Sequence, residues 1–132
     1  WDPFLNESLS NIHMCTWPER LDECDFIVLA CALTESNFHM LNLDTLKCLK
    51  KGVSIINVSR GPLIEEKALI EGLKQGIIKS VALDVYEEEP ISTSSELFTF
   101  HQNIFGSHNG SNTVEAVDRA SIKAISIIKS FI

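Results

Sequence analysis

Two apolar runs flank a helical pattern in residues 53–85, VSIINVSRGPLIEEKALIEGLKQGIIKSVALDV. The runs at 53–58 and 80–85 are nearly continuous in apolar residues, which is typical of strands that are covered on both faces. Residues 65–75 between them have helical spacing and are followed by Gly76, a residue suited to the position after a helix. This stretch therefore predicts two parallel strands that are joined by a helix through a right-handed crossover.

The same alternation extends on both sides of this unit. Apolar runs at 26–31 and 103–106 predict two more strands, and residues 12–15 and the first residues of the chain are candidates for further strand ends. Helices are predicted at 44–51, which ends in lysines, and at 18–23. Alternating strands and helices predict an α/β fold with one open parallel sheet and helices on both of its faces.

The last predicted helix has the clearest start signal. Asn112 is the expected N-cap, and Glu115 lies three residues on, where it can return a bond in the manner of a capping box. The apolar residues of this helix share one face: Val117, Ala120, Ala124, Ile128 and Phe131.

The composition excludes several classes of protein. The chain has 132 residues with 11 Lys and Arg against 18 Asp and Glu, a formal net charge of −7, which argues against binding to nucleic acid. The 45% of apolar and 22% of charged residues support one domain with a packed core. The longest apolar run, residues 26–33, is far shorter than the ~20 residues that cross a bilayer, so we expect no membrane partner.

Four cysteines stand at positions 15, 24, 31 and 48, without a C-x-x-C pair or a nearby cluster of histidines. This spacing predicts neither a metal site nor a disulfide framework, and it favours a reducing, cytoplasmic location. The sequence opens with Trp-Asp-Pro-Phe and shows no signal-like segment. We expect a chain that begins partway through a larger protein.

Polar and charged side chains follow each predicted strand. In an open parallel sheet, ligands bind outside the carboxyl ends of the strands, where loops and helix amino termini converge. The residues at these positions are Thr34 after the first run, Ser59 and Arg60 after the second, Asp84 and residues 87–89 after the third, and Ser107 and His108 after the fourth. A base, an acid and a fixed cation therefore meet at one edge of the predicted sheet.

Each of these residues alone also has an ordinary structural interpretation. An arginine after a strand is usually solvated or caps a helix, and three glutamates in a row usually form an exposed acidic loop. A histidine in Gly-Ser-His-Asn-Gly is often a polar turn residue. Their joint placement favours a functional site.

Three segments resemble one known family. Residues 57–69 (NVSRGPLIEEKAL), 82–90 (ALDVYEEEP) and 107–113 (SHNGSNT) are similar to the second signature, the third signature and the histidine loop of the D-isomer-specific 2-hydroxyacid dehydrogenases. This family contains phosphoglycerate, glycerate, formate and D-lactate dehydrogenases. Leu33 and Thr34 also resemble part of its Pro-Leu-Thr stretch, and the order and intervals match through essentially the whole chain. The resemblance implies a Rossmann-type sheet that binds NAD.

The resemblance also implies an oxidoreductase that transfers a hydride between nicotinamide and C2 of a D-2-hydroxy acid or a 2-keto acid. His108 is then the general acid/base, Glu89 pairs with it, and Arg60 binds the substrate carboxylate through two parallel hydrogen bonds. A proton moves at the C2 oxygen while the hydride moves at C2, and histidine is the side chain that titrates near neutrality.

Four residues are assigned to the cofactor. Asp84 resembles the family's carboxylate near the nicotinamide carboxamide, and Thr34 and Ser59 lie at the same predicted edge. Asp2 resembles the acidic residue that accepts hydrogen bonds from the adenosine ribose hydroxyls and repels a 2′-phosphate, which favours NAD over NADP. The alternative for Asp2 is a turn-forming residue before Pro3.

The match to the family is incomplete. The glycine fingerprint G-x-G-x-x-G, expected before Asp2, and the family's substrate domain are both missing. Residues 1–132 are therefore predicted to be a partial dinucleotide-binding domain, truncated at its N-terminus and a poor enzyme by itself. Ala32 replaces a common proline, and Glu65 replaces a common aspartate at a helix N-cap, where the longer side chain predicts weaker capping.

Two other functions stay open at this point. The chain is alternatively an NAD-sensing binding protein, since proteins that resemble this family include transcriptional corepressors, or a non-catalytic relic. Retention of Arg60, Glu89 and His108 favours the dehydrogenase. The resemblance also implies a homodimer.

Overall fold

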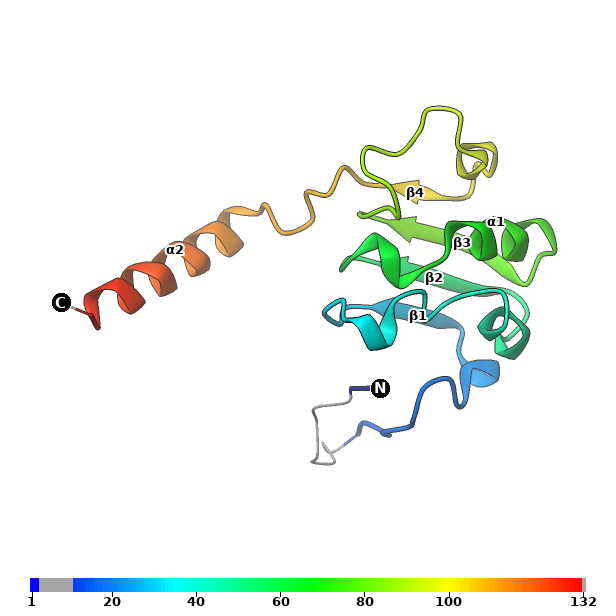
Figure 1. Cartoon of the computed structure of the whole chain (residues 1–132), viewed down its shortest axis with the longest axis horizontal. Helices are drawn as coiled ribbons and strands as arrows, with labels where there is room; N and C mark the ends of the chain where they lie inside the picture. The colour runs from blue at the N-terminus through cyan, green and yellow to red at the C-terminus, as the bar shows by residue number, and fades with distance from the viewer. Residues whose placement is uncertain (3–10, 132) are drawn as a thin grey trace.

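A computed structural model describes residues 1–2 and 11–131 of the chain. Four parallel strands form one sheet in the order β1–β2–β3–β4; β1 spans Phe26–Leu29, β2 Val53–Asn57, β3 Ile78–Leu83 and β4 Ile104–Phe105 (Figure 1). The predicted open parallel sheet of a Rossmann-type α/β fold is thereby confirmed. Because all four strands run the same way, their carboxyl ends lie at one edge.

Within the described residues, two α-helices and five short 3-10 helices connect and flank the strands. The α-helices are α1 (Glu66–Lys74) and α2 (Val114–Lys129). The 3-10 helices are η1 (Leu21–Glu23), η2 (Glu35–Asn37), η3 (Thr45–Cys48), η4 (Gly61–Leu63) and η5 (Glu96–Thr99). The helix predicted at 65–75 is confirmed as α1. None of the helices in residues 1–2 and 11–131 has the length and apolar character needed to span a membrane.

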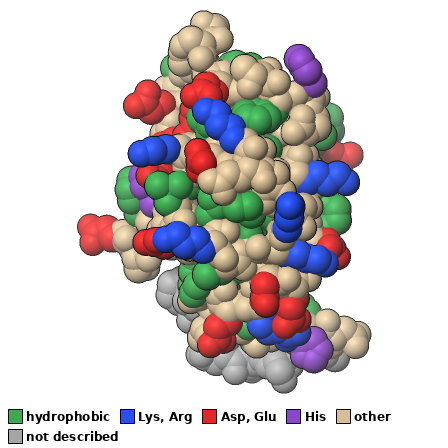
Figure 2. All heavy atoms as spheres, turned by 90° about the vertical axis from the view of Figure 1, so that its right-hand side faces the viewer, with side chains coloured by type: hydrophobic (Ala, Val, Ile, Leu, Met, Phe, Trp, Pro, Cys, Tyr) green, Lys and Arg blue, Asp and Glu red, His purple; other side chains and the backbone are tan. Residues whose placement is uncertain are grey.

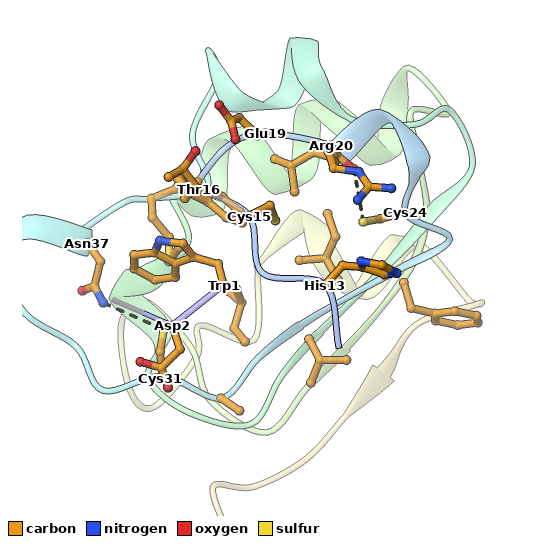
Figure 3. Close-up of a pocket in the computed structure, with 18 of the residues that line it drawn as sticks. Trp1, Asp2, His13, Cys15, Thr16, Glu19, Arg20, Cys24, Cys31 and Asn37 are labelled. Atoms are coloured by element: carbon orange, nitrogen blue, oxygen red, sulfur yellow. Dashed lines mark hydrogen bonds between the residues drawn. The ribbon is translucent and has the colours of Figure 1, made fainter. Parts of the chain in front are cut away.

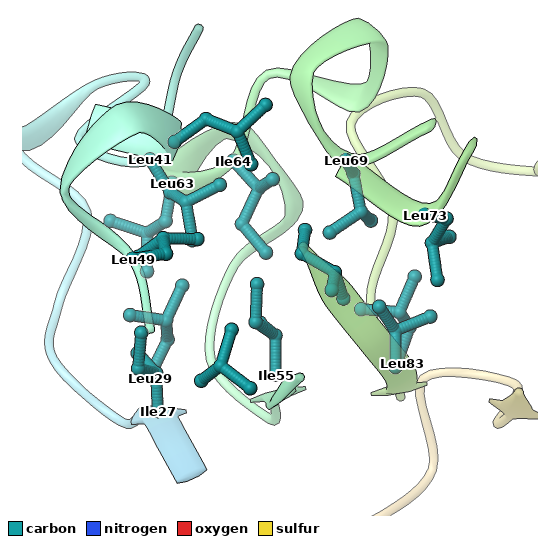
Figure 4. Packing of buried hydrophobic residues seen from close by; sticks show 14 of the residues in the cluster. Ile27, Leu29, Leu41, Leu49, Ile55, Leu63, Ile64, Leu69, Leu73 and Leu83 are labelled. Atoms are coloured by element: carbon teal, nitrogen blue, oxygen red, sulfur yellow. The ribbon is translucent and has the colours of Figure 1, made fainter. Parts of the chain in front are cut away.

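The hydrophobic core lies on one face of the sheet. Strand pairing places Ile27 beside Ile55 and Ile55 beside Val81, and all three side chains are buried. Leucines from α1 and from the connections between strands pack on this face: Leu41, Leu49, Leu63, Leu69 and Leu73 (Figure 4). Removing these side chains from water stabilises the register of β1, β2 and β3, and so fixes where their carboxyl ends lie.

The opposite face of the sheet carries the alternate residues of the same strands. Phe26, Val28 and Ile104 on this face are 65%, 56% and 69% exposed. The sequence predicts helices on both faces of the sheet. Among the described residues, α1 and the connections between strands cover the face that carries Ile55, whereas Phe26, Val28 and Ile104 stay exposed on the other face. The apolar runs therefore indicate strands correctly, although their alternate side chains differ in exposure.

The helix predicted at 44–51 is wrong in its length, because only η3 forms there. Asn42 Oδ1 accepts the backbone N–H groups of Asp44 and Thr45 at 2.9 and 3.1 Å, which begins the turn. The backbone N–H of Lys50 then donates to the carbonyl of Leu21 at 3.2 Å instead of continuing a helix. A tertiary hydrogen bond thus ends the helix that the sequence pattern favours.

The last helix starts differently from the prediction. Thr113, not Asn112, is the N-cap of α2, and its Oγ1 accepts the backbone N–H of Ala116 at 3.2 Å. None of the residues of α2 is buried, and the helix extends away from the sheet (Figure 1).

Two weaker predictions concern the start of the chain. Residues 12–15 form no strand, and the segment at 18–23 is a turn followed by η1. The strand ends expected among the first residues fall mostly on 3–10, which lie outside the described residues.

On the face shown in Figure 2, basic and acidic side chains are interspersed.

Candidate active site

The connections that follow β2, β3 and β4 carry the charged residues of the candidate site. They leave the parallel sheet at the same edge, so residues far apart in the sequence come together. Nδ1 of His108 lies 2.7 Å from Oε2 of Glu89. The structure therefore places these two predicted site residues in direct contact.

Glu89 is also held by its own connection. Its Oε1 accepts the backbone N–H of Tyr86 at 3.0 Å, and the Tyr86 hydroxyl donates to the carbonyl of Gly106 at 2.6 Å. The hydrogen bond with His108, followed by the bond from the Tyr86 backbone, lowers the pKa of Glu89 below its ordinary value of 4.5. Near neutral pH, Glu89 is therefore an ionised acceptor for the imidazole.

Asp84 holds the backbone of the loop that carries His108. Its Oδ1 accepts the N–H of Asn109 at 3.0 Å, and its Oδ2 accepts the N–H of Gly110 at 2.7 Å. These bonds, that of Gly110 first, lower the pKa of Asp84 below its ordinary value of 3.8. Both carboxylate oxygens thus shape the histidine loop, and a contact of Asp84 with the nicotinamide carboxamide stays a prediction.

Arg60 lies at the same edge, directly after β2. Its backbone carbonyl accepts a hydrogen bond from Asn57 Nδ2 at 2.9 Å, and Asn57 is only 1% exposed. The guanidinium Nη1 donates to the carbonyl of Ser59 at 2.7 Å. Its positive charge adds a smaller contribution to the low pKa of Glu89.

Gly61 lets the connection after β2 approach the connection after β3. A methyl group at this position would overlap the backbone carbonyl of Tyr86. A residue without a side chain is therefore required where the Arg60 turn meets the segment that carries Glu89.

Two of the residues assigned to the cofactor line a separate cavity. It has a volume of about 1150 Å³, lies beside β1, and is lined by Trp1, Asp2, Thr34 and Asn37 among others (Figure 3). Ser59 does not line it, but its hydroxyl donates to the carbonyl of Cys31, which does.

The remaining predicted site residues lie elsewhere. Arg60, Glu89, His108 and Asp84 are not among the residues that line the cavity beside β1. The structure therefore divides the predicted residues into a group around the His108 loop and a group around this cavity.

Sequence reasoning missed several residues that hold these connections. The buried Asn37 donates to the carbonyl of Ala32 at 2.8 Å and accepts the N–H of Thr34 at 2.7 Å. The position of Asn37 three residues after Thr34 is a capping signal that could have identified it. Asn57 could have been identified as a polar residue within the apolar run that forms β2. His39 and Glu87 form a second His–Glu contact at 2.7 Å, and no sequence signal pairs these two residues.

A family model described as "D-isomer specific 2-hydroxyacid dehydrogenase, NAD binding domain" matches residues 1–110. The chain is 41% identical over 109 residues to glyoxylate/hydroxypyruvate reductase B of Serratia proteamaculans, a match that covers 83% of this chain and 34% of that protein. The chain thus spans about a third of the length of the curated relatives it matches.

Solved structures of two enzymes also resemble this chain in fold. A glyoxylate reductase from Paecilomyes thermophila superposes with a TM-score of 0.75 at 34% identity, covering 83% of this chain and 34% of that one. D-lactate dehydrogenase from Aquifex aeolicus, complexed with NAD and lactic acid, superposes with a TM-score of 0.73 at 26% identity, covering 84% of this chain and 38% of that one.

Proposed function

The chain belongs to the D-isomer-specific 2-hydroxyacid dehydrogenases, whose NAD-binding domain it matches over residues 1–110, and from this membership we propose that it serves hydride transfer between NAD and C2 of a D-2-hydroxy acid or 2-keto acid. The observation that carries the proposal is the 2.7 Å contact between His108 Nδ1 and Glu89 Oε2. This contact pairs a proton donor with a carboxylate at the sheet edge where ligands bind.

In this proposal His108 moves the proton. Glu89 accepts the hydrogen bond from Nδ1, which leaves Nε2 to exchange a proton with the C2 oxygen of the substrate. When a keto acid is reduced, its C=O double bond becomes a C–O single bond, a C–H bond forms at C2 and an O–H bond forms at the oxygen, to which Nε2 gives the proton. Bound NADH supplies the hydride that C2 receives. The ionised Glu89 stabilises the imidazolium before the proton is transferred.

Arg60 binds the carboxylate next to C2. A planar guanidinium can donate two parallel, charge-assisted hydrogen bonds to a carboxylate, an arrangement that lysine cannot make. A substrate held at both carboxylate oxygens has a defined orientation of its C2 carbonyl relative to His108. The hydrogen bond from the buried Asn57 fixes where the Arg60 turn leaves β2.

The cavity beside β1 is our proposed site for the adenosine part of NAD. Its volume of about 1150 Å³ is of the order of cofactor sites, ~300–1,000 Å³. Asp2 lines it and offers carboxylate oxygens to the ribose hydroxyls, whereas a 2′-phosphate would be repelled, so NAD is favoured over NADP. Thr34, Ser59 and Asp84 are kept as cofactor contacts because they follow β1, β2 and β3 at the carboxyl edge of the sheet.

The organisation of the protein also belongs to the proposal. Residues 1–132 act as part of a dinucleotide-binding domain, in a homodimer located in the cytoplasm. The first two statements rest on the family resemblance, and the third rests on the cysteine spacing. The names of the relatives make glyoxylate the first acid to test.

The test uses a hybrid reductase, in which this chain replaces the segment that it matches in the Serratia proteamaculans protein. We expect NADH-dependent reduction of glyoxylate. Glu89→Gln should lower kcat much more than Glu88→Gln, because Glu89 contacts His108 and the exposed Glu88 of the same connection does not. The alternative function, an NAD-sensing binding protein, predicts a folded hybrid that binds NADH without turnover. That outcome would overturn the proposal.

A further inference from the structure

A second His–Glu contact lies next to the first. Glu87 Oε1 lies 2.7 Å from Nε2 of His39, and Glu87 Oε2 accepts the backbone N–H of Glu66 at 2.6 Å. Each oxygen of Glu87 thus has a partner, one a side chain 48 residues away in the sequence and the other the first residue of α1. The proposed reaction uses neither His39 nor Glu87.

We propose that Glu87 and His39 are positioning residues for the Glu89–His108 pair, because their contact fixes the connection after β3 with Glu89 within hydrogen-bond reach of His108. This inference rests on the proposed function, in which that pair carries the proton. Glu87 and His39 act through Glu89 and touch no reacting atom.

The supporting contact is less exposed than the pair it supports. The side chains of His39 and Glu87 are 26% and 29% exposed, compared with 47% and 36% for His108 and Glu89. A hydrogen bond is stronger where water competes less. The Glu87 contact is therefore better suited to hold this connection than the Glu89 contact is by itself.

Helix α1 gives Glu87 a fixed partner. Glu65, the residue before the helix, makes no side-chain cap bond, which agrees with the weak capping expected from its length. Glu87 supplies the acceptor from another segment, and its negative charge lies at the positive end of the helix dipole. Because α1 packs into the core through Leu69 and Leu73, the position of its first N–H group is fixed.

His39 joins this contact to the turn that carries Arg60. The backbone N–H of His39 donates to the carbonyl of Pro62 at 2.9 Å, and Pro62 belongs to η4, which directly follows Arg60. Contacts therefore run from the Arg60 turn through His39 and Glu87 to the connection of Glu89. Glu89 lies two residues after Glu87, so a displacement of Glu87 also moves Glu89.

The test measures the Glu89–His108 contact by NMR in the 132-residue chain. Two signals report on it: the titration of the Glu89 carboxyl carbon, and the ring nitrogen that carries the proton in neutral His108. Glu87→Ala should raise the pKa of Glu89 toward its ordinary value of 4.5 and deplete the form of His108 protonated at Nδ1.

Two variants of His39 refine this test. His39→Ala should shift both signals in the same direction, and it leaves the bond between Glu87 and α1 in place. His39→Gln retains a side-chain donor for Glu87, so it should restore most of the wild-type behaviour. A residue that only stabilised the fold would change the melting temperature without moving either signal in the folded chain.

Glu88→Ala is the matched control, since this exposed residue belongs to the same connection and should change neither signal. The Tyr86 backbone and Arg60, which also lower the pKa of Glu89, remain in every variant. A folded Glu87→Ala or His39→Ala chain with wild-type signals overturns the positioning role. If Glu87→Ala does not fold, His39→Ala decides alone.

Glu89→Ala, which removes the acceptor, separates this inference from the proposed function. If it moves the proton of His108 while Glu87→Ala and His39→Ala do not, only the positioning role fails. If Glu89→Ala itself leaves His108 unchanged, the Glu89–His108 pair and the proposed function fail with it.

Discussion

Oδ2 of Asp84 accepts the backbone N–H of Gly110 at 2.7 Å, across 26 residues of sequence. Together with the bond from Asn109 to Oδ1, this contact shapes the loop around His108. A carboxylate at the end of β3 therefore determines where the residue after β4 lies. The parallel sheet makes this possible because it ends both strands at one edge.

Replacing Asp84 should weaken this loop. Asp84→Asn leaves one acceptor oxygen and no charge for the two N–H groups, so we expect a loss of about 1–2 kcal/mol in the free energy of unfolding. Urea unfolding of the chain measures the loss, with Asp118→Asn on the exposed helix α2 as the control. Equal stabilities of the Asp84→Asn and Asp118→Asn chains would contradict the role of Asp84.

Acid should destabilise the chain through the same carboxylates. The pKa values of Asp84 and Glu89 are lowered from 3.8 and 4.5 in the folded state, so the unfolded chain binds more protons in this range. Their contribution to stability is present above these ordinary values and is lost as the pH falls through the folded pKa values.

The free energy of unfolding should therefore fall below a pH of about 4.5. Asp84→Asn should make this loss less steep. Urea unfolding at a series of pH values provides the measurement, and identical slopes with and without Asp84 would remove this residue from the acid response.

A methyl group at Gly61 should be costly, since it would overlap the carbonyl of Tyr86. We expect Gly61→Ala to destabilise the chain by roughly 3 kcal/mol. Gly52→Ala is the matched control, because Gly52 has a φ of +88° but nothing near its missing Cβ, so backbone strain of about 1 kcal/mol is expected. Thermal or urea unfolding compares the two, and equal losses would mean that the close approach at Gly61 is unimportant.

Arg60→Lys should damage the handling of the acid more than the binding of the cofactor. Lysine keeps the charge but loses the two-pronged geometry that a carboxylate requires. In the hybrid reductase we expect kcat/KM for glyoxylate to fall while the affinity for NADH stays within about twofold, a difference below ~0.5 kcal/mol. Steady-state kinetics and NADH titration measure the two quantities, and losses of equal size would argue against a substrate role.

The sequence predicts the architecture well where local patterns agree with tertiary contacts. All four strands and α1 appear where apolar runs and helical spacing indicate them, and the site residues follow strand ends. The pattern fails at 44–51, where the bond from Lys50 to Leu21 competes with the helix. Such a bond depends on a segment that is distant in sequence, so local signals cannot reveal it.

In the candidate site, too, some features follow from local sequence patterns and others depend on tertiary contacts. Strand ends alone place Arg60, Glu89 and His108 at one edge, and the family resemblance assigns their roles. The contact between His39 and Glu87 depends on how the connections fold over the sheet, and the left-handed φ of +50° at His39 is a conformation that histidine adopts only occasionally. The uses of Asp84 and Asn57 as backbone partners are likewise visible only in three dimensions.

The kcat of the His108→Ala hybrid reductase tests the central claim most directly. General acid/base catalysis by the Glu89–His108 pair predicts a fall of roughly 10²–10⁴-fold for glyoxylate reduction, with NADH affinity unchanged. His101→Ala, an exposed histidine seven residues earlier, should leave kcat as it is. Turnover by His108→Ala near that of the His101→Ala control would contradict the account.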